Sequence, residues 1–203
     1  MKRTVLTLTL SIALLAGFAA VSHAETLSIG DSVPMKDYMM KSVNGSEVSI
    51  ADVAGKNGAL VIFTCNTCPW VQAWESRIAA IGKAAEEKGI GVILVNSNDP
   101  GKSAGDGFEH MKKRAREVGY TVPYTVDKGS KLAKTFGATR TPEAFLFDAE
   151  GKLRYHGTID DNAQEPKNVE AQYLRDAVNA VAGGEKVPER KTKALGCSIK
   201  WYS

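Results

Sequence analysis

The chain has 203 residues, of which 43% are hydrophobic and 24% charged, and it is long enough for one domain with a sizeable core. This ordinary globular composition excludes a disordered chain, a coiled coil and a multi-span membrane protein. The formal net charge of +3 falls close to +1 once Lys2 and Arg3 of the N-terminal segment are set aside. The charge therefore gives no support for a nucleic-acid or anionic-membrane partner.

Residues 1–24 have the pattern of a secretory signal peptide. A basic start precedes an uncharged apolar run over residues 4–21, and a small-x-small sequence ends at Ala24. We expect cleavage after Ala24 and export to the periplasm or to the outside of the cell. An uncleaved membrane anchor is the alternative, because the apolar run approaches the length that spans a bilayer.

The remaining residues, 25–203, alternate strand and helix patterns. Short strands on either side of Asn44 and Gly45 predict a β-hairpin, because Asn-Gly is the strongest short turn signal. Residues 59–63 are apolar at consecutive positions, as in a strand buried on both faces. The later predicted elements are a helix over 71–85, a strand over 90–95, a helix over 108–118, a strand over 124–126, a short helix over 130–136, strands over 143–147 and 153–157, and a helix over 173–181.

This order of elements predicts a single α/β domain with a central mixed β-sheet flanked by helices. The domain begins with the N-terminal hairpin and ends with a C-terminal tail, residues 185–203. The tail carries no clear element, but it contains Cys197, the third cysteine of the chain. An odd cysteine count in an exported chain leaves one thiol that must be explained.

The other two cysteines, Cys65 and Cys68, stand where the buried strand ends and a helix begins. At this spacing the two sulfurs can reach disulfide geometry. We expect Cys65 to face the N-terminus of the helix, where unpaired N–H groups and the helix dipole favour a thiolate. Three uses remain open: an inert disulfide, a pair of metal ligands, or redox exchange.

The context of the pair favours redox exchange. A C-x-x-C sequence at a strand-to-helix junction of a βαβ chain is typical of thioredoxin-like redox motifs. After residue 24 the chain has no second C-x-x-C and only two histidines, His110 and His156, so it lacks the ligands of a closed zinc site. We expect no metal and no cofactor.

Five separated motifs extend over nearly the whole of the mature chain. They are Phe-Thr-Cys-Asn-Thr-Cys-Pro-Trp-Val (63–71), Asn-Ser-Asn-Asp (96–99), Thr-Pro-Glu-Ala-Phe-Leu-Phe-Asp (141–148), Tyr-His-Gly (155–157) followed by two aspartates (160–161), and Gly-Cys-Ser-Ile-Lys-Trp (196–201). In this order they resemble the redoxin branch of the thioredoxin superfamily, a peroxiredoxin-like group related to AhpC/TSA proteins.

The resemblance implies a thioredoxin-like fold and thiol-disulfide oxidoreductase activity. It implies that Thr141 and Pro142 face the cysteine pair through a cis-proline and present backbone to an extended substrate. Cys65 then becomes the nucleophile and Cys68 the resolving thiol. The expected partners are protein or small-molecule disulfides and thiols.

One departure from peroxiredoxins keeps a second activity open. Their peroxidatic cysteine lies in a P-x-x-x-T-x-x-C pattern. Cys68 occupies that cysteine's position, but Val61 replaces the proline and Cys65 the threonine. A thiol peroxidase is the first alternative function, and a copper-binding protein that uses the same thiolates is the second, because soft thiolates select Cu(I).

Three further residues are candidates for supporting roles. Glu143 either accepts the proton of Cys68 or is a solvated side chain. Trp70 either contacts substrate or packs. Cys197 is a resolving thiol, a third metal ligand or a buried small side chain, and its motif predicts that the tail docks on the domain.

Overall fold

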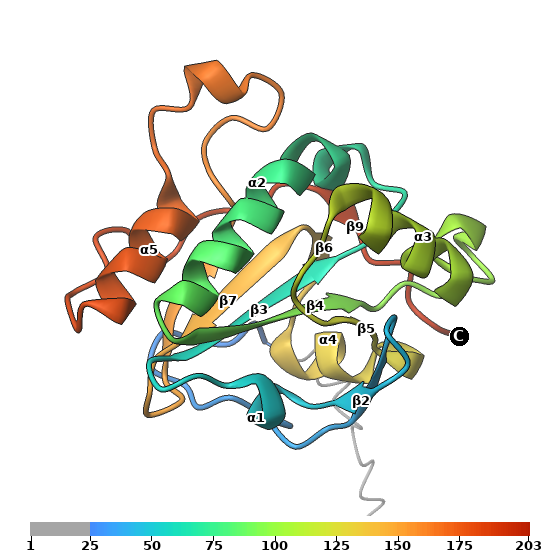
Figure 1. Ribbon diagram of the computed structural model, residues 1–203, viewed down its shortest axis with the longest axis horizontal. Coiled ribbons are helices and arrows are strands. Elements are labelled where there is room, and N and C mark those ends of the chain that lie inside the picture. Colours follow the sequence, from blue (N-terminus) through green and yellow to red (C-terminus); the bar gives the residue numbers. More distant parts are fainter. Residues whose placement is uncertain (1–24) are drawn as a thin grey trace, which may run out of the picture.

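The computed structural model describes residues 25–203 (Figure 1), so the predicted signal peptide lies outside the described part. A seven-stranded mixed sheet forms the centre of the domain. In spatial order the strands are β2 (Glu47–Val48), β1 (Met40–Ser42), β5 (Tyr124–Val126), β4 (Ile90–Asn96), β3 (Gly58–Thr64), β7 (Glu143–Phe147) and β8 (Leu153–Gly157). Three neighbouring strands, β3, β4 and β5, run parallel, and the other pairs are antiparallel.

Strand β3 is the centre of this sheet, and all seven of its residues are buried. Its side chains alternate between two apolar clusters because successive residues of a strand point to opposite faces. Leu60 and Ile62 pack under one layer of helices, and Val61 and Phe63 pack on the other face. The first layer contains α2 (Pro69–Glu87), α3 (Phe108–Val118) and α5 (Tyr173–Ala182), and the second contains α1 (Ile50–Val53) and α4 (Lys131–Phe136).

Helix α2 follows the predicted pattern. Its buried residues recur every three or four positions, including Val71, Trp74 and Ile78, and this spacing places them on one face. Cys68 is the N-cap residue, and Pro69 occupies the first helical position, where its missing N–H costs no helical hydrogen bond. The helix therefore begins immediately after the second cysteine of the pair.

Two local elements differ from the sequence prediction. The sequence pattern predicts the second hairpin strand over residues 47–50, but that strand ends at Val48. Residues 50–53 form the short helix α1, because Ser49 and Asp52 form a reciprocal capping box. In the tail, strand β9 (Cys197–Ser198) pairs antiparallel with β6 (Arg140–Thr141) as a separate two-stranded sheet. Within residues 25–203 there are also three 3₁₀ turns, η1 (Ala104–Asp106), η2 (Lys128–Ser130) and η3 (Pro166–Asn168).

Among the helices in residues 25–203, none is both long and apolar enough to cross a membrane.

Candidate active site

The predicted cysteine pair lies at the carboxyl end of β3. Cys65 follows the last residue of that strand, and Cys68 caps α2. Both side chains are buried, with 3% and 2% of their surface exposed, and they form a cluster with Val71. Cys197 from the tail packs against the same cluster, and all three cysteines are free thiols. The structure thus brings together three cysteines rather than two.

Thr141 and Pro142 face the pair. The peptide bond between them is cis, as predicted. The Sγ atom of Cys65 lies 3.3 Å from Thr141 Oγ1, and the Sγ atom of Cys68 lies 3.2 Å from the Thr141 carbonyl oxygen. A single residue before the proline therefore contacts both sulfurs.

The tail covers the other side of Thr141. In the antiparallel pairing of β6 and β9, Thr141 is opposite Cys197 (Figure 1). Gly196 makes this approach possible: its φ is +158°, and a Cβ atom there would lie 2.1 Å from the Thr141 carbonyl oxygen. Beyond the strand, Ile199 is buried and the Lys200 N–H donates to Asn98 Oδ1 at 2.8 Å. The prediction that the tail docks on the domain is confirmed.

The two cysteines of the pair have opposite electrostatic surroundings. Interaction with the neighbouring Cys68 sulfur raises the pKa of Cys65, and burial and the negative charge of Asp106 raise it further. The same interaction lowers the pKa of Cys68 to about 5 against the effect of burial, and the Cys197 side chain and the Val71 N–H contribute in the same direction. The Thr141 carbonyl oxygen, which accepts a hydrogen bond from the Cys68 thiol, favours the protonated form, as burial does. The surroundings therefore favour a thiolate on Cys68.

This result corrects the expected placement of the thiolate. The sequence prediction put Cys65 beside the helix N-terminus and Cys68 within the first turn. Because α2 begins at Pro69, the N–H groups of its first turn lie beside Cys68. Cys65 instead has a buried carboxylate, Asp106, as its charged neighbour.

Asp106 is a site residue that the sequence analysis missed. It is 3% exposed and lies in η1, within a segment that reads only as a long polar loop. Its carboxylate accepts the Asn66 N–H at 2.6 Å and the Thr67 hydroxyl at 2.9 Å, so it holds both residues between the cysteines. Although burial opposes the shift, the hydrogen bonds lower the pKa of Asp106. The other donors to this carboxylate are Asn96, Asn98 and Ser103.

Glu143 has a different role from the predicted one. Its carboxylate is buried, accepts the N–H groups of Thr139 and Arg140 at 2.8 and 2.9 Å, and pairs with His156 Nε2 at 2.7 Å. Neither sulfur is among its hydrogen-bond partners within residues 25–203. Glu143 is therefore neither solvated nor placed to accept the Cys68 proton, and it shapes the backbone that leads into β6.

For Trp70 the packing alternative is confirmed, and contact with substrate stays a prediction. Its ring centroid lies 5.9 Å from that of Trp74, and 37% of its surface remains exposed. It therefore packs on α2 and leaves a face open beside Cys68. Trp74 donates to Asp160 Oδ1 at 2.7 Å, and Arg77 forms an ion pair with the same carboxylate, so Asp160 holds the loop after β8 against α2.

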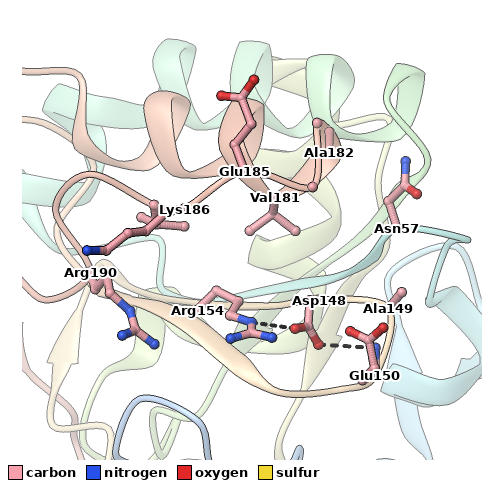
Figure 2. Close-up of a pocket in the computed structure, with 13 residues that line it drawn as sticks. Asn57, Asp148, Ala149, Glu150, Arg154, Val181, Ala182, Glu185, Lys186 and Arg190 are labelled. Atoms are coloured by element: carbon pink, nitrogen blue, oxygen red, sulfur yellow. Dashed lines mark hydrogen bonds and ion pairs between the residues drawn. The ribbon is translucent and has the colours of Figure 1, made fainter.

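A cavity of about 750 Å³ lies away from the cysteines, at the amino end of β3, where Asp148 pairs with Arg154 (Figure 2). In the part of the chain that the structure describes, no group of three or more His, Cys, Asp or Glu side chains has the geometry to hold a metal ion.

A cysteine pair between a central strand and a helix, faced by a cis-proline, defines the site of a thioredoxin-like fold. The family profile described as Redoxin matches residues 28–173, and the chain belongs to this family. The chain is 25% identical over 129 residues to a protein named thiol-disulfide oxidoreductase ResA from Bacillus thuringiensis (strain Al Hakam), a match that covers 64% of this chain and 69% of the relative.

Two solved structures show the same architecture. An uncharacterized conserved protein from Geobacillus kaustophilus is similar with a TM-score of 0.79 and 33% identity, over 86% of this chain and 93% of that one. A secreted disulfide oxidoreductase of Mycobacterium tuberculosis, described as homologous to DsbE of E. coli, is similar with a TM-score of 0.54 over 70% of this chain and 95% of that one. Because the identity to the second is 14%, that likeness shows the fold alone.

Proposed function

We propose that the protein is a thiol-disulfide oxidoreductase whose Cys65 and Cys68 cycle between two thiols and a disulfide. The observation that carries this proposal is the contact of both sulfurs with Thr141, beside the cis-proline. Membership of the redoxin family and the similarity to proteins named ResA support it.

The electrostatics of the pair favour Cys68 as the attacking group, where the sequence predicted Cys65. In this order the Cys68 thiolate attacks a substrate disulfide, and one substrate sulfur leaves as a thiolate that takes up a proton. The mixed disulfide removes the negative charge from Cys68, and this relieves the main cause of the raised pKa of Cys65. Cys65 then loses its proton to solvent and attacks the Cys68 sulfur. The products are the Cys65–Cys68 disulfide and a second substrate thiol.

The order of attack can be tested by trapping the mixed disulfide. The Cys65→Ser/Cys197→Ser protein, in which no other thiol of the cluster can displace a substrate from Cys68, and the Cys68→Ser protein are each mixed with oxidised glutathione, quenched in acid and mapped by mass spectrometry. We expect glutathione to couple rapidly to Cys68 in the first variant and slowly to Cys65 in the second. Rapid coupling to Cys65 in the Cys68→Ser protein would restore the order predicted from the sequence, and no coupling in either would refute the oxidoreductase.

A second candidate function is a thiol peroxidase. The lowered pKa of Cys68, at the position of a peroxidatic cysteine, is the observation that favours it. The absence of the usual proline and threonine, replaced by Val61 and Cys65, argues against high efficiency. Fast peroxide consumption together with sulfenic acid trapped on Cys68 would make this the primary activity.

We also propose that the protein acts after export, with residues 1–24 removed. The basic start, the apolar run and the small-x-small end of this segment support the proposal. N-terminal sequencing of the protein from a periplasmic or secreted fraction should begin at Glu25. A membrane fraction that retains Met1 or Lys2 would instead support an anchor.

A further inference from the structure

The tail strand β9 pairs with β6, the backbone that leads into the cis-proline. The resemblance to thioredoxin-like proteins implies that Thr141 and Pro142 present this backbone to an extended substrate. That edge is already paired: Arg140 is opposite Ser198, and Thr141 is opposite Cys197. The protein thus supplies its own chain segment at this edge, with a cysteine opposite the residue that contacts both sulfurs.

Several contacts hold the tail in this register. The Arg140 guanidinium donates to Ser198 Oγ at 3.0 Å, and the Ile199 N–H donates to the Thr139 carbonyl oxygen at 3.0 Å. The Asp99 N–H donates to the Lys200 carbonyl oxygen at 2.7 Å. Because bonds on both sides of Cys197 fix its position, its contact with the cysteine cluster is built into the fold.

The pKa of Cys197 is also shifted in the direction opposite to that of Cys68. Cys197 packs against the cluster that contains Cys68, and burial together with the neighbouring Cys68 sulfur raises the pKa of Cys197 to about 11. At neutral pH this places a protonated thiol against the sulfur that carries the negative charge. Conversion of Cys68 into a mixed disulfide removes that charge and frees Cys197 to lose its proton.

We propose that Cys197 is a third catalytic thiol, which β9 holds in the place of a substrate cysteine, and that it forms a disulfide with Cys68 during turnover. This inference rests on the proposed oxidoreductase function. When Cys68 carries a substrate sulfur, Cys197 loses its proton to solvent and its thiolate attacks the Cys68 sulfur. The Cys68–Cys197 bond forms, the bond from Cys68 to the substrate breaks, and the substrate leaves as a thiolate that takes up a proton.

The electrons of this route balance without a further reagent. Cys68 and Cys197 together supply the two electrons that reduce the substrate disulfide to two thiols. Cys65 can afterwards attack the Cys68 sulfur, which returns Cys197 as a thiol and leaves the Cys65–Cys68 disulfide. Cys68 is therefore the shared centre of two alternative disulfides.

The direct test is acid-quenched peptide mapping of the wild-type protein during reaction with oxidised glutathione. We expect the Cys65–Cys68 and Cys68–Cys197 disulfides both to appear within one turnover. If Cys197 stays fully open to alkylation while Cys65–Cys68 forms, the inference is wrong and the proposed function stands. If neither disulfide forms, both fail, and the two failures are thereby distinguished.

Two variants isolate the second disulfide. In Cys65→Ser protein treated with the thiol oxidant diamide at low protein concentration, we expect an intramolecular Cys68–Cys197 disulfide, and its absence would overturn the inference. In the same background, Gly196→Ala should slow this step by on the order of tenfold to a hundredfold, because the new Cβ atom collides with the Thr141 carbonyl oxygen and displaces the thiol by about 1 Å.

Gly183→Ala is the matched control for that variant. It makes the same change in the segment between α5 and the tail, where a Cβ atom would meet its nearest neighbour at 3.4 Å. We expect it to leave the rate of disulfide formation unchanged. Equal rates in the Gly196→Ala and Gly183→Ala proteins would show that the β6–β9 pairing does not deliver Cys197, which contradicts the inference.

Discussion

Cys68 lies between two segments that hold a cysteine in different ways. On one side the turn over residues 65–68 carries Cys65, and the buried carboxylate of Asp106 fixes this turn through Asn66 and Thr67. On the other side the tail carries Cys197, fixed by backbone pairing with β6. In the turn Cys65 is buried and lies near the negative charge of Asp106, whereas in the tail Cys197 is half-buried and pairs with the short strand β6. The comparison suggests that Cys65 is a fixed partner of Cys68 and Cys197 a more easily displaced one.

The largest expected effect comes from removing the shared centre. Cys68→Ser should reduce disulfide-reductase activity by about 10³ or more. Without Cys68 no mixed disulfide forms there for Cys65 of the turn or Cys197 of the tail to attack. Reduction of insulin disulfides by the purified variant measures this. Gly183→Ala is the comparison, since the nearest neighbours of a Cβ atom there would be Asn179 and Glu185 and none of the three cysteines. A Cys68→Ser protein with more than a tenth of wild-type activity would break the account of the site.

The next effect tests how the turn is held. Asp106→Asn should destabilise the reduced protein by about 3 kcal/mol, because an amide cannot accept all the buried donors that the carboxylate satisfies. Loss of the negative charge should also lower the pKa of Cys65. Urea unfolding measures the first change, and site-resolved alkylation against pH measures the second.

The control for that charge removal is Asp161→Asn. Asp161 is exposed and accepts the Glu170 N–H, so its neutralisation should change the free energy of unfolding by no more than about 0.5 kcal/mol. If both variants lose the same free energy of unfolding, the hydrogen bonds of the Asp106 carboxylate do not stabilise the turn.

A smaller effect is expected at Thr141, which lies between the two segments. Thr141→Val removes the hydroxyl next to the Cys65 sulfur while keeping the backbone that pairs with the tail. Because that hydrogen bond lowers the pKa of Cys65, its loss should slow the attack of Cys65 on a mixed disulfide by about fivefold, the equivalent of about 1 kcal/mol. Thr141→Ser keeps the hydroxyl and should retain the wild-type rate in stopped-flow measurements. A slow Thr141→Ser protein would show that packing, not the hydroxyl, sets this rate.

Local patterns predicted the half of the site that lies on the turn. The consecutive apolar residues of β3 and the spacing of Val71, Trp74 and Ile78 in α2 are readable without tertiary contacts, and together they place the cysteine pair at a strand-to-helix junction. Helix α2 begins at Pro69, two residues before the predicted start, and its N-cap residue is Cys68 rather than Cys65. The surroundings therefore lower the pKa of Cys68, where the sequence prediction placed the lowered pKa at Cys65.

The other half depends on contacts between distant parts of the chain. The two-residue strands β6 and β9 are too short to show a periodic pattern, and their pairing joins Thr141 to a cysteine 56 positions later. Asp106 reaches Asn66 across a similar gap of 40 positions. Packing sets both contacts, so the sequence predicted that the tail docks on the domain but not that Cys197 lies opposite Thr141 or that Asp106 reaches Asn66.

Site-resolved alkylation of the wild-type protein against pH tests the central claim, that Cys68 is the thiolate between two protonated cysteines. A thiol reacts in proportion to its thiolate fraction, which rises as the pH rises through the pKa. The account predicts that Cys68 reacts first, with a midpoint near pH 5, and that Cys65 and Cys197 stay largely unmodified until well above pH 8. If Cys65 instead reacts first and Cys68 titrates above pH 8, the assignment of the attacking thiolate is contradicted.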